Sequence, residues 1–152
     1  MKKFFSLGLI ATVLAVFTFS SCSKDDDDSI VGQWKLETMK IEGSGVSINV
    51  NVAELGGSDI IEFKSDGTYV ATSVDEDGDT EVVKGKYSVN GSVLTATYDD
   101  GDSEKINFSL SGNTLEFYEE GYYDVAEDEM YYKQPAGKNF PKVKESMIYK
   151  RM

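Results

Sequence analysis

The feature that most constrains the fold is an alternation of apolar and polar residues that recurs along almost the whole chain after residue 30. In the segment 46–52, for example, every second residue is Val or Ile. A two-residue period in β-branched and aromatic residues is typical of half-buried β-strands. It predicts strands at 31–41, 46–52, 60–63, 68–74, 81–89, 92–98, 104–110, 114–118, 129–133 and 147–151.

Tight-turn sequences separate these predicted strands. Asp66-Gly67 and Asn90-Gly91 are dipeptides that tolerate positive φ at both central positions of a hairpin turn. Gly78, Gly101 and Gly112 mark three more turns. Strands joined in this way are expected to pair antiparallel with their neighbours in the sequence.

A meander of many strands tends to close into a barrel, because closure removes the free edges of the sheet. The sequence therefore predicts an all-β fold, a small antiparallel up-and-down barrel of about eight to ten strands. Little helix is expected: Ala53–Gly57 and Lys142–Ser146 each have room for one turn. Both prolines fall in the segment 135–143, which is expected to be a loop.

The N-terminus has the three-part pattern of a secretory signal peptide. Lys2 and Lys3 precede an apolar run at 4–19, and small residues lead to Cys22, the only cysteine. A membrane-spanning helix is the alternative, but the run reaches only about 24 Å, short of the roughly 30 Å hydrocarbon core. A lone cysteine has no disulfide partner, so lipidation is its expected use.

Phe19-Ser20-Ser21-Cys22 resembles the lipobox of bacterial lipoproteins. The resemblance implies cleavage before Cys22 and attachment of diacylglycerol to its sulfur. Several acyl chains, at about 0.8 kcal/mol per buried CH₂, would give stable anchoring.

The residues after the cysteine resemble the short acidic export signal of surface lipoproteins in gut-type and gliding Gram-negative bacteria. They are Ser23, Lys24, Asp25, Asp26, Asp27 and Asp28. The resemblance implies an outer-membrane lipoprotein that faces the cell exterior. The alternatives are a solvated spacer, which a block of like charges forms in any case, and an anchor that faces the periplasm.

The expected organisation is a signal peptide at 1–21, a lipidated cysteine with its acidic tether at 22–29, and one barrel domain at 30–152. The full chain has a net charge of −12 and no histidine. The negative charge opposes binding to nucleic acid. The absence of histidine removes the commonest general base and transition-metal ligand. We therefore expect no enzyme and no cofactor.

Several short motifs occur in the order found in lipocalin-like bacterial lipoproteins. The segment 30–36 resembles the Gly-x-Trp opening of lipocalin-type barrels, and the segment 63–69 resembles the strand-turn-strand that follows it. Gly85-x-Tyr87 and the segment 112–115 resemble the later hairpins of that group. The resemblance covers nearly the whole chain after the tether, and it implies a lipocalin-like barrel.

In lipocalins a tryptophan packs at the closed end of the barrel, often beneath an arginine from the last strand. The resemblance assigns these structural roles to Trp34 and Arg151. Arg151 is the only arginine in the chain. A cation–π contact between the two would contribute about 0.5–2 kcal/mol.

Two functions are compatible with such a barrel. In the first, the barrel binds a small apolar or amphipathic ligand inside. The expected inward residues are Trp34, Leu36, Tyr69, Leu94, Ile106, Phe108, Leu115 and Phe117. In the second, a solid barrel contacts a glycan or a protein partner. An eight-stranded barrel can be filled by its own side chains, so an interior cavity of roughly 300 Å³ would distinguish the two.

The candidate contact residues for a ligand or partner are aromatic, because aromatic side chains with a polar tip are favoured at binding surfaces. They are Tyr69, Phe108, Phe117, Tyr118, Tyr122 and Tyr123. The alternative is that these are ordinary strand and core residues.

Acidic residues give no clear site. The turns at 75–79 and 99–102 have oxygen ligands that suit calcium, but they lack the bidentate glutamate of a full calcium loop, so we expect ordinary turns and no metal. Glu119 and Glu120 are adjacent on a predicted strand and point to opposite faces. That arrangement does not suit the paired carboxylates of a glycosidase.

Replacing the anchoring cysteine tests the N-terminal assignment. We expect Cys22→Ser to move the protein from the membrane fraction to the soluble fraction, because the variant lacks the sulfur that carries the lipid. Changing Asp25–Asp28 to alanine should leave the protein in the membrane but remove its labelling on whole cells. A Cys22→Ser variant that stays in the membrane pellet would favour a helical anchor, and persistent surface labelling would make the acidic run a spacer.

Overall fold

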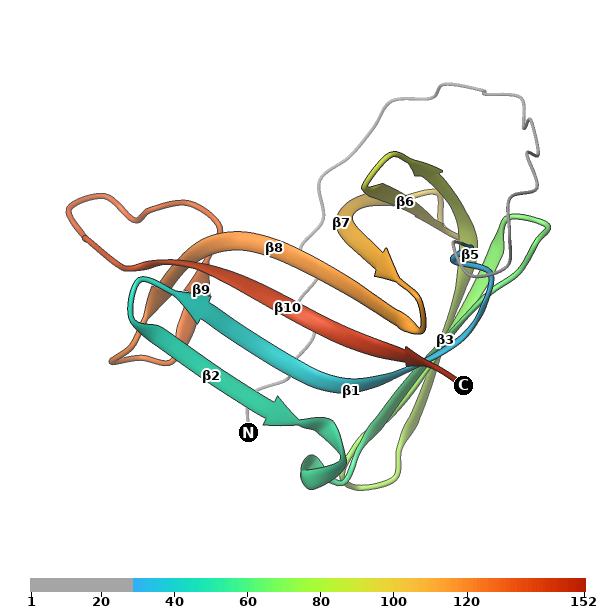
Figure 1. Cartoon of the computed structure of the whole chain (residues 1–152), viewed down its shortest axis with the longest axis horizontal. Helices are drawn as coiled ribbons and strands as arrows, with labels where there is room; N and C mark the ends of the chain where they lie inside the picture. Colours follow the sequence, from blue (N-terminus) through green and yellow to red (C-terminus); the bar gives the residue numbers. More distant parts are fainter. Residues whose placement is uncertain (1–28) are drawn as a thin grey trace.

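Residues 29–152, the part of the chain that the computed structural model describes, form ten antiparallel strands and one short 3-10 helix, η2 (Figure 1). The strands are β1 (Gly32–Gly43), β2 (Val46–Asn51), β3 (Ser58–Phe63), β4 (Thr68–Val74), β5 (Thr80–Asn90), β6 (Val93–Tyr98), β7 (Ser103–Ser111), β8 (Thr114–Asp124), β9 (Glu129–Tyr131) and β10 (Lys142–Arg151). The helix η2 spans Val52–Leu55. Within this range no helix is long and apolar enough to cross a membrane. The predicted signal peptide, Cys22 and the acidic tether up to Asp28 lie outside the described residues.

Eight of the strands close into a barrel. Their order is β1, β3, β4, β5, β6, β7, β8 and β10, and β10 pairs with both β8 and β1 to complete the circle. The predicted all-β antiparallel barrel is therefore confirmed. The remaining two strands lie outside the circle, since β2 pairs with β1 and β9 pairs with β8.

Three barrel strands continue beyond the barrel and carry β2 and β9. The first part of β1, Gly32–Lys35, pairs with β3, whereas its second part, from Thr38 onward, pairs with β2. A register shift between Leu36 and Thr38 marks a bulge at the change of partner, as expected where a strand bends. The strands β2, β1, β10, β8 and β9 thus form a second, five-stranded sheet, here called the sheet extension. It projects from one end of the barrel (Figure 1), which we call the open end.

The structure differs from the predicted strands in three places. Lys142–Ser146, predicted as a helical turn, is the first half of β10, and it is held in extended form by pairing with β1 on one side and β8 on the other. The strand β8 continues six residues beyond the predicted end at Tyr118. Nor is the chain a simple meander, because β2 does not pair with β3, nor β9 with β10.

Each of the predicted Asp-Gly and Asn-Gly turns uses a single left-handed residue, the glycine. In the β3–β4 turn, Gly67 N–H donates to Lys64 O, and Lys64 N–H donates to Thr68 O. The same two bonds recur in the β4–β5 and β6–β7 turns. Gly67 has φ +81° and Gly91 has φ +60°, while Asp66 and Asn90 keep negative φ. Both predicted turns are therefore present, and within each dipeptide only the glycine takes the left-handed conformation.

The inward side chains fill the barrel as one hydrophobic core. Seven of the eight predicted inward residues are buried, and Ile106 is half-buried against them. The aromatic rings meet edge to face, with Phe63 and Tyr87 at 4.9 Å between centroids and Phe117 and Tyr149 at 5.6 Å. Such pairs contribute about 0.5–1.5 kcal/mol beyond the area they bury.

The end opposite the sheet extension, the closed end, is organised around Trp34, which is fully buried. The Cζ atom of Arg151 lies 4.3 Å from the centroid of the Trp34 ring. The same guanidinium donates hydrogen bonds to Val31 O at 2.9 Å and Ser29 O at 2.7 Å. The indole N–H of Trp34 donates to Ile30 O at 2.7 Å. The segment that enters β1 is therefore held across the closed end by these two side chains.

The Gly-x-Trp motif also has a steric reason at this end. Gly32 has φ +137°, and a Cβ atom there would lie 2.8 Å from Nη1 of Arg151. A larger residue would therefore strain the backbone and displace the guanidinium from the Trp34 ring.

The two side chains of the closed end should differ in their effect on stability. We expect Trp34→Ala to lower the free energy of unfolding by about 3–5 kcal/mol, because it empties the centre of a packed core. Arg151→Ala should cost about 1–3 kcal/mol, since it removes a cation–π contact and two charge-assisted hydrogen bonds. Urea unfolding of both variants measures this, with the exposed neighbour Lys150→Ala as control. An Arg151→Ala variant as stable as the control would contradict the role assigned to the guanidinium.

Candidate functional site

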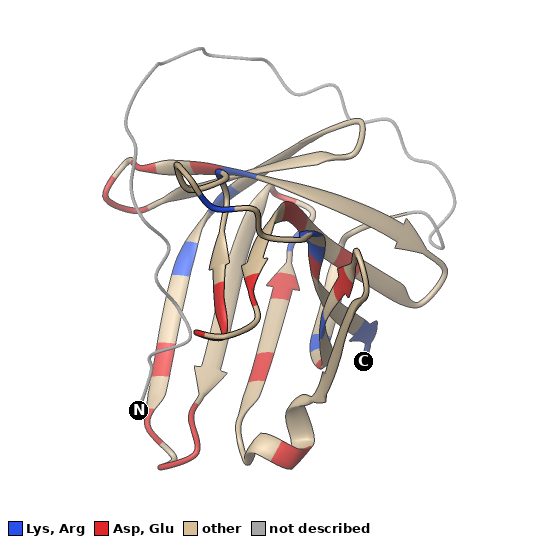
Figure 2. Ribbon diagram, turned by 90° about the vertical axis from the view of Figure 1, so that its left-hand side faces the viewer, with Lys and Arg blue, Asp and Glu red and all other residues tan. Residues whose placement is uncertain are grey.

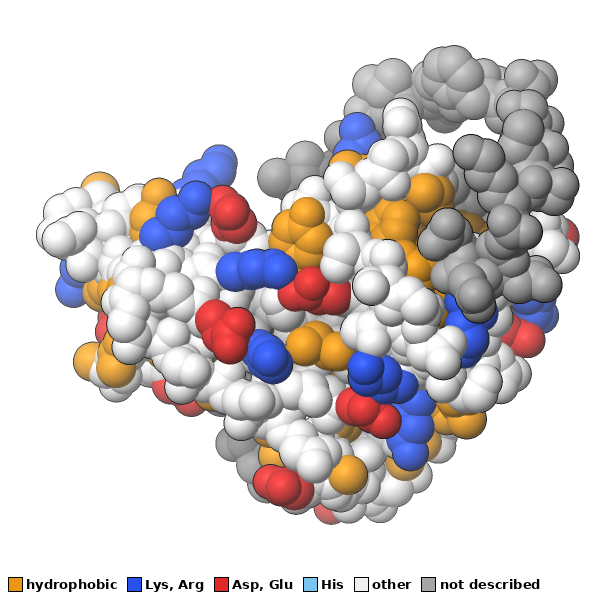
Figure 3. Space-filling model, viewed as in Figure 1, with side chains coloured by type: hydrophobic (Ala, Val, Ile, Leu, Met, Phe, Trp, Pro, Cys, Tyr) orange, Lys and Arg blue, Asp and Glu red, His pale blue; other side chains and the backbone are white. Residues whose placement is uncertain are grey.

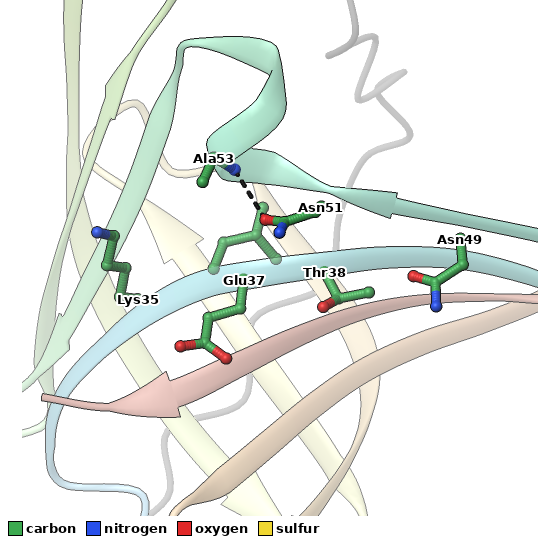
Figure 4. A pocket seen from close by; sticks show the side chains of 7 residues that line it. Lys35, Glu37, Thr38, Asn49, Asn51 and Ala53 are labelled. Carbon is green, nitrogen blue, oxygen red and sulfur yellow. Dashed lines mark hydrogen bonds between the residues drawn. The ribbon is translucent and has the colours of Figure 1, made fainter.

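Two hollows stand out on the surface of the described part of the chain, and each is lined mainly by polar side chains of the barrel strands and their neighbours. The larger, of about 540 Å³, lies where β1 changes partner from β3 to β2 (Figure 4). It is lined by the polar side chains Lys35, Glu37, Thr38, Asn49 and Asn51 and by Ala53. The smaller, of about 300 Å³, lies on the outer face of β4 and β5, beside Lys64, Lys84 and Lys86. Neither is an interior cavity, and the core residues occupy the barrel itself.

Two opposed glutamates lie on the inner face of the sheet at the open end, on the same face as the core residues. Glu119 on β8 and Glu145 on β10 are direct cross-strand partners. They lie two residues beyond the partners Phe117 and Met147, which belong to the core or pack against it. Because side chains alternate along a strand, both glutamates share the face of these core residues.

A third carboxylate and two tyrosines belong to the same group. Glu104 on β7 accepts a hydrogen bond from the Tyr98 hydroxyl at 2.9 Å. Its charge raises the pKa of Glu119, after the larger effect of burial, while the Tyr132 hydroxyl acts in the opposite direction. We call Glu104, Glu119 and Glu145 the inner carboxylates.

The outer face of the same two strands has the opposite arrangement. There Lys142 pairs with Glu120 at 2.5 Å, and Lys144 pairs with Glu116 at 2.6 Å. Figure 3 shows lysines and acidic side chains side by side over this face of the sheet extension. Among residues 29–152, no lysine or arginine lies within 4.0 Å of an inner carboxylate. The negative charge of the inner face is therefore uncompensated within the described chain.

The protonation equilibria reflect this lack of a partner. Burial and the charge of Glu119 raise the pKa of Glu145. Burial and the surrounding charges of Glu145, Glu119 and Glu104 raise the pKa of Tyr132 to about 12. On the outer face, hydrogen bonds from Lys144, Ser146 and Ser109 lower the pKa of Glu116 in spite of its partial burial.

An apolar surface adjoins the inner carboxylates. Its residues share the inner face of β1, β2 and β10 and are half-buried: Met39, Ile41, Ile48, Val50 and Met147. Ile41 is the cross-strand partner of both Ile48 and Glu145. Of the described elements, only β1 and η2 pack closely against β2. Methionine and isoleucine side chains therefore line a surface that continues outward from the core, here called the apolar face.

Two buried side chains of the barrel strands each have a polar atom without a hydrogen-bond partner in the described chain. The Tyr69 side chain is 6% exposed and its hydroxyl is unpartnered. Asp59 is 8% exposed: its Oδ2 accepts from the Tyr149 hydroxyl at 3.4 Å, and its Oδ1 has no partner. A buried polar group without a hydrogen bond lowers the stability of the fold by about 1–3 kcal/mol, so each of these two atoms is a cost to the barrel.

Burial raises the pKa of Asp59 to about 6, against the smaller opposing effects of the hydroxyls of Tyr149 and Ser73. Tyr149 is almost fully buried, and desolvation together with the Asp59 charge raises its own pKa well above the usual range. The two side chains join β10 to β3 through the barrel interior.

The structure does not bring the six predicted aromatic contact residues onto one surface. Tyr69, Phe108, Phe117 and Tyr123 are buried, the last with its hydroxyl bonded to Asp128. Tyr118 and Tyr122 are half-buried on the outer face, where the Lys144 ammonium lies 4.4 Å from the centroid of the Tyr118 ring. Trp34 and Arg151 lie together at the opposite end, at the closed end of the barrel.

Acidic residues occur in several of the turns (Figure 2, red), and the carboxylates of the turns at 75–79 and 99–102 bond to their own backbone. Asp75 Oδ1 accepts from the N–H groups of Asp77 and Asp79, and Asp100 Oδ1 accepts from Asp102 N–H. These are Asx-type turns. Within residues 29–152 no three acidic side chains converge as metal ligands would.

Sequence reasoning missed the inner carboxylates, although a signal was present. In the segment 104–110, Glu104 occupies the same alternating positions as Ile106 and Phe108. Glu119 likewise follows Leu115 and Phe117 in steps of two. A carboxylate in the inward register of a strand is the informative exception to the pattern, because it places a charge where the core is expected.

The chain is similar to known proteins in sequence and in fold. Residues 30–117 match the model of a family described as lipocalin-like domain. The fold is similar to a lipocalin-like protein from Bacteroides uniformis, with a TM-score of 0.48, 16% identity, and coverage of 81% of this chain and 98% of that one. It is also similar to an uncharacterized protein from Bacteroides eggerthii, with a TM-score of 0.46, 12% identity, and coverage of 80% and 99%. No curated protein matches the chain.

The Asp59 carboxyl should make stability fall as pH rises. Burial raises its pKa from the ordinary 3.8 to about 6, so the folded state binds the proton more tightly than the unfolded chain does. Stability is gained as pH falls through 6 toward 4, by about 3 kcal/mol in all. We expect Asp59→Asn to gain in stability relative to the wild type between pH 4 and pH 8, measured by urea unfolding. The exposed turn variant Asp77→Asn is the control, and an Asp59→Asn difference that does not change with pH would contradict the assignment.

Proposed function

Since this chain belongs to the family of lipocalin-like domains, we propose that it is a binding protein that holds a small amphipathic ligand at the open end of its barrel. The observation that carries the proposal is the apolar face beside the inner carboxylates. It joins an apolar surface to polar groups, which is the composition of most small-molecule sites. The filled barrel favours a ligand that lies on this face and not deep inside.

The side chains of the apolar face suit ligands of varied shape. Met39 and Met147 are cross-strand partners, and both pack against the core while remaining half-buried. Methionine is unbranched and adaptable, so it fits irregular apolar groups. A ligand on this surface would be covered on one side by the sheet and would leave its other side toward solvent or a partner.

We also propose that the protein is anchored through a lipid at Cys22, in the outer membrane and facing the cell exterior. The residues 22–28 reach at most about 25 Å when fully extended. They lead into Ser29, whose carbonyl is bonded to Arg151 at the closed end. This attachment would keep the closed end near the membrane and direct the open end away from it, where a ligand arrives from solution.

One observation favours the alternative, a surface module that contacts a glycan or protein partner. On the outer face of the sheet extension, Tyr131 stacks on Phe140 with 5.6 Å between ring centroids. Tyr122 is the cross-strand partner of Tyr131, and Tyr118 lies further along β8. This row of half-buried rings is the aromatic surface on which sugars or peptides would stack.

A neutral fluorescent amphiphile, N-phenyl-1-naphthylamine, tests ligand binding. We expect its emission to rise with the wild-type protein and its affinity to fall about tenfold in Ile48→Asn, because a polar residue interrupts the apolar face. Val82→Asn is the matched control, since Val82 is an exposed β-branched residue on β5 at the outer face.

Two outcomes would contradict the proposal. If the wild type gives no emission change, or if Ile48→Asn and Val82→Asn bind the probe equally, the apolar face is not the site. The alternative is tested with a glycan array. Binding of the wild-type protein to the array that is lost when Tyr122 and Tyr131 are changed to alanine would establish the alternative.

A further inference from the structure

We infer that the ligand carries a positively charged nitrogen, an ammonium or guanidinium group, which the inner carboxylates bind while its apolar body lies on the apolar face. This inference rests on the proposed function and names the chemical class of its ligand. It assigns a role to three acidic residues that neither the packing nor the known family fold explains.

The first argument is the pairing of like charges. Residues directly opposite each other on antiparallel strands have Cβ atoms about 4.5–5.5 Å apart, and like charges there are unfavourable. Glu119 and Glu145 stand in this relation on β8 and β10. Glu104 adds a third negative charge that acts on Glu119. A cation between them would convert mutual repulsion into attraction.

The outer face of the same strands shows what the chain does where no external cation is needed. Lys142 and Lys144 lie on β10 and reach Glu120 and Glu116 on β8. The inner positions of β10 hold Val143, Glu145 and Met147 instead. The described chain thus supplies lysine partners to the outer glutamates and withholds them from the inner pair.

The second, independent argument is the Tyr69 hydroxyl, which is buried without a partner. The Tyr69 ring lies over Gly85, where a Cβ atom would be 2.9 Å from Cε1. Gly85 is the cross-strand partner of Tyr98, whose hydroxyl bonds to Glu104. Burial and, after it, the charges of Asp99, Glu104 and Asp100 raise the pKa of Tyr69, so the charge of one inner carboxylate, Glu104, reaches this side chain. An ammonium or guanidinium has several N–H donors and offers this hydroxyl oxygen a partner.

The neighbours of the carboxylates favour an organic cation. Glu145 lies between Glu119 on one side and Ile41 on the other, so the charged site adjoins the apolar face directly. An amine on an apolar body satisfies both surfaces at once, whereas a metal ion would leave the apolar face unused. A metal ion needs several ligands that converge on it, and within residues 29–152 no three acidic side chains are so arranged, whereas an ammonium can bind between the Glu119–Glu145 pair with Glu104 nearby.

Binding should weaken as pH falls. The groups that face the cation are Glu104 on β7, Glu119 on β8, Glu145 on β10, Tyr98 on β6 and Tyr132 after β9. Glu119 and Glu145 have raised pKa values, so they take up protons at a higher pH than exposed glutamates do. Both tyrosines have raised pKa values and stay neutral.

The test compares three probes that share one apolar body: 4-phenylbutylammonium, the neutral alcohol 4-phenylbutan-1-ol and the anion 4-phenylbutanoate. Affinities are measured by calorimetry on the full chain in lipid nanodiscs, with empty nanodiscs as blank. We expect the ammonium to bind about tenfold or more tightly than the alcohol, and the anion not to bind, because charge-assisted hydrogen bonds to carboxylate form only with the cation. Glu119→Gln with Glu145→Gln should reduce the ammonium to the affinity of the alcohol.

The matched control is Glu116→Gln with Glu120→Gln, which removes the same two charges from the opposite face of the same sheet. It should leave the preference for the ammonium unchanged, and circular dichroism confirms that both double variants are folded. Equal affinity for ammonium and alcohol would overturn this inference and leave the proposed ligand binding intact. If both double variants lose the same affinity for the ammonium, the effect is one of net charge, and the inference is overturned. If Ca²⁺ displaces the ammonium at micromolar concentration, the site is a metal site, and the inference is overturned as well. Failure of all three probes to bind would reject both proposals.

Discussion

The structure depends on the double pairing of β10. This strand lies between β1 and β8 over almost its whole length, and without it neither the barrel nor the sheet extension would close. It also contributes a side chain to the closed end, the interior and the open end of the barrel. Arg151 covers Trp34 at the closed end, Tyr149 bonds to Asp59 in the interior, and Glu145 meets Glu119 at the open end. The same strand, β10, thus carries residues that stabilise the barrel and a residue of the proposed site.

The two ends of the barrel follow opposite rules. At the closed end every polar group of Trp34 and Arg151 named above has a partner, and the ring is fully buried. At the open end the two glutamates Glu119 and Glu145 are opposed, and in the barrel interior Tyr69 and Asp59 each have an unpartnered oxygen. Proteins satisfy buried polar groups wherever stability alone is selected, so the exceptions gather where a ligand completes the set. This contrast is the reason for which we propose a site at the open end.

Much of the fold was predictable because alternation and turn chemistry are local. The barrel strands and the family of the chain were predicted from short segments such as 30–36 and 63–69. Lys142–Ser146 was not, because its inward position is occupied by Glu145 and the alternation of apolar residues fails there. The inner carboxylates escaped for the same reason: one sequence shows a polar residue, and only the register across β8 and β10 shows that two of them face each other. The lipidation and export assignments stay predictions, since residues 1–28 lie outside the described range.

The arrangement also explains how one strand pair carries two electrostatic surfaces. Adjacent residues of a strand point to opposite faces, so Glu119 and Glu120 experience different surroundings although they are neighbours in sequence. The pKa of Glu120 is lowered by Lys142, whereas that of Glu119 is raised by burial and by Glu104. A chain of high net negative charge attracts cations in general, and at Glu119 and Glu145 two opposed carboxylates without an ion-pair partner among residues 29–152 also lie beside apolar side chains. The proposed selectivity for an amphipathic cation would therefore rest on the register of these two strands.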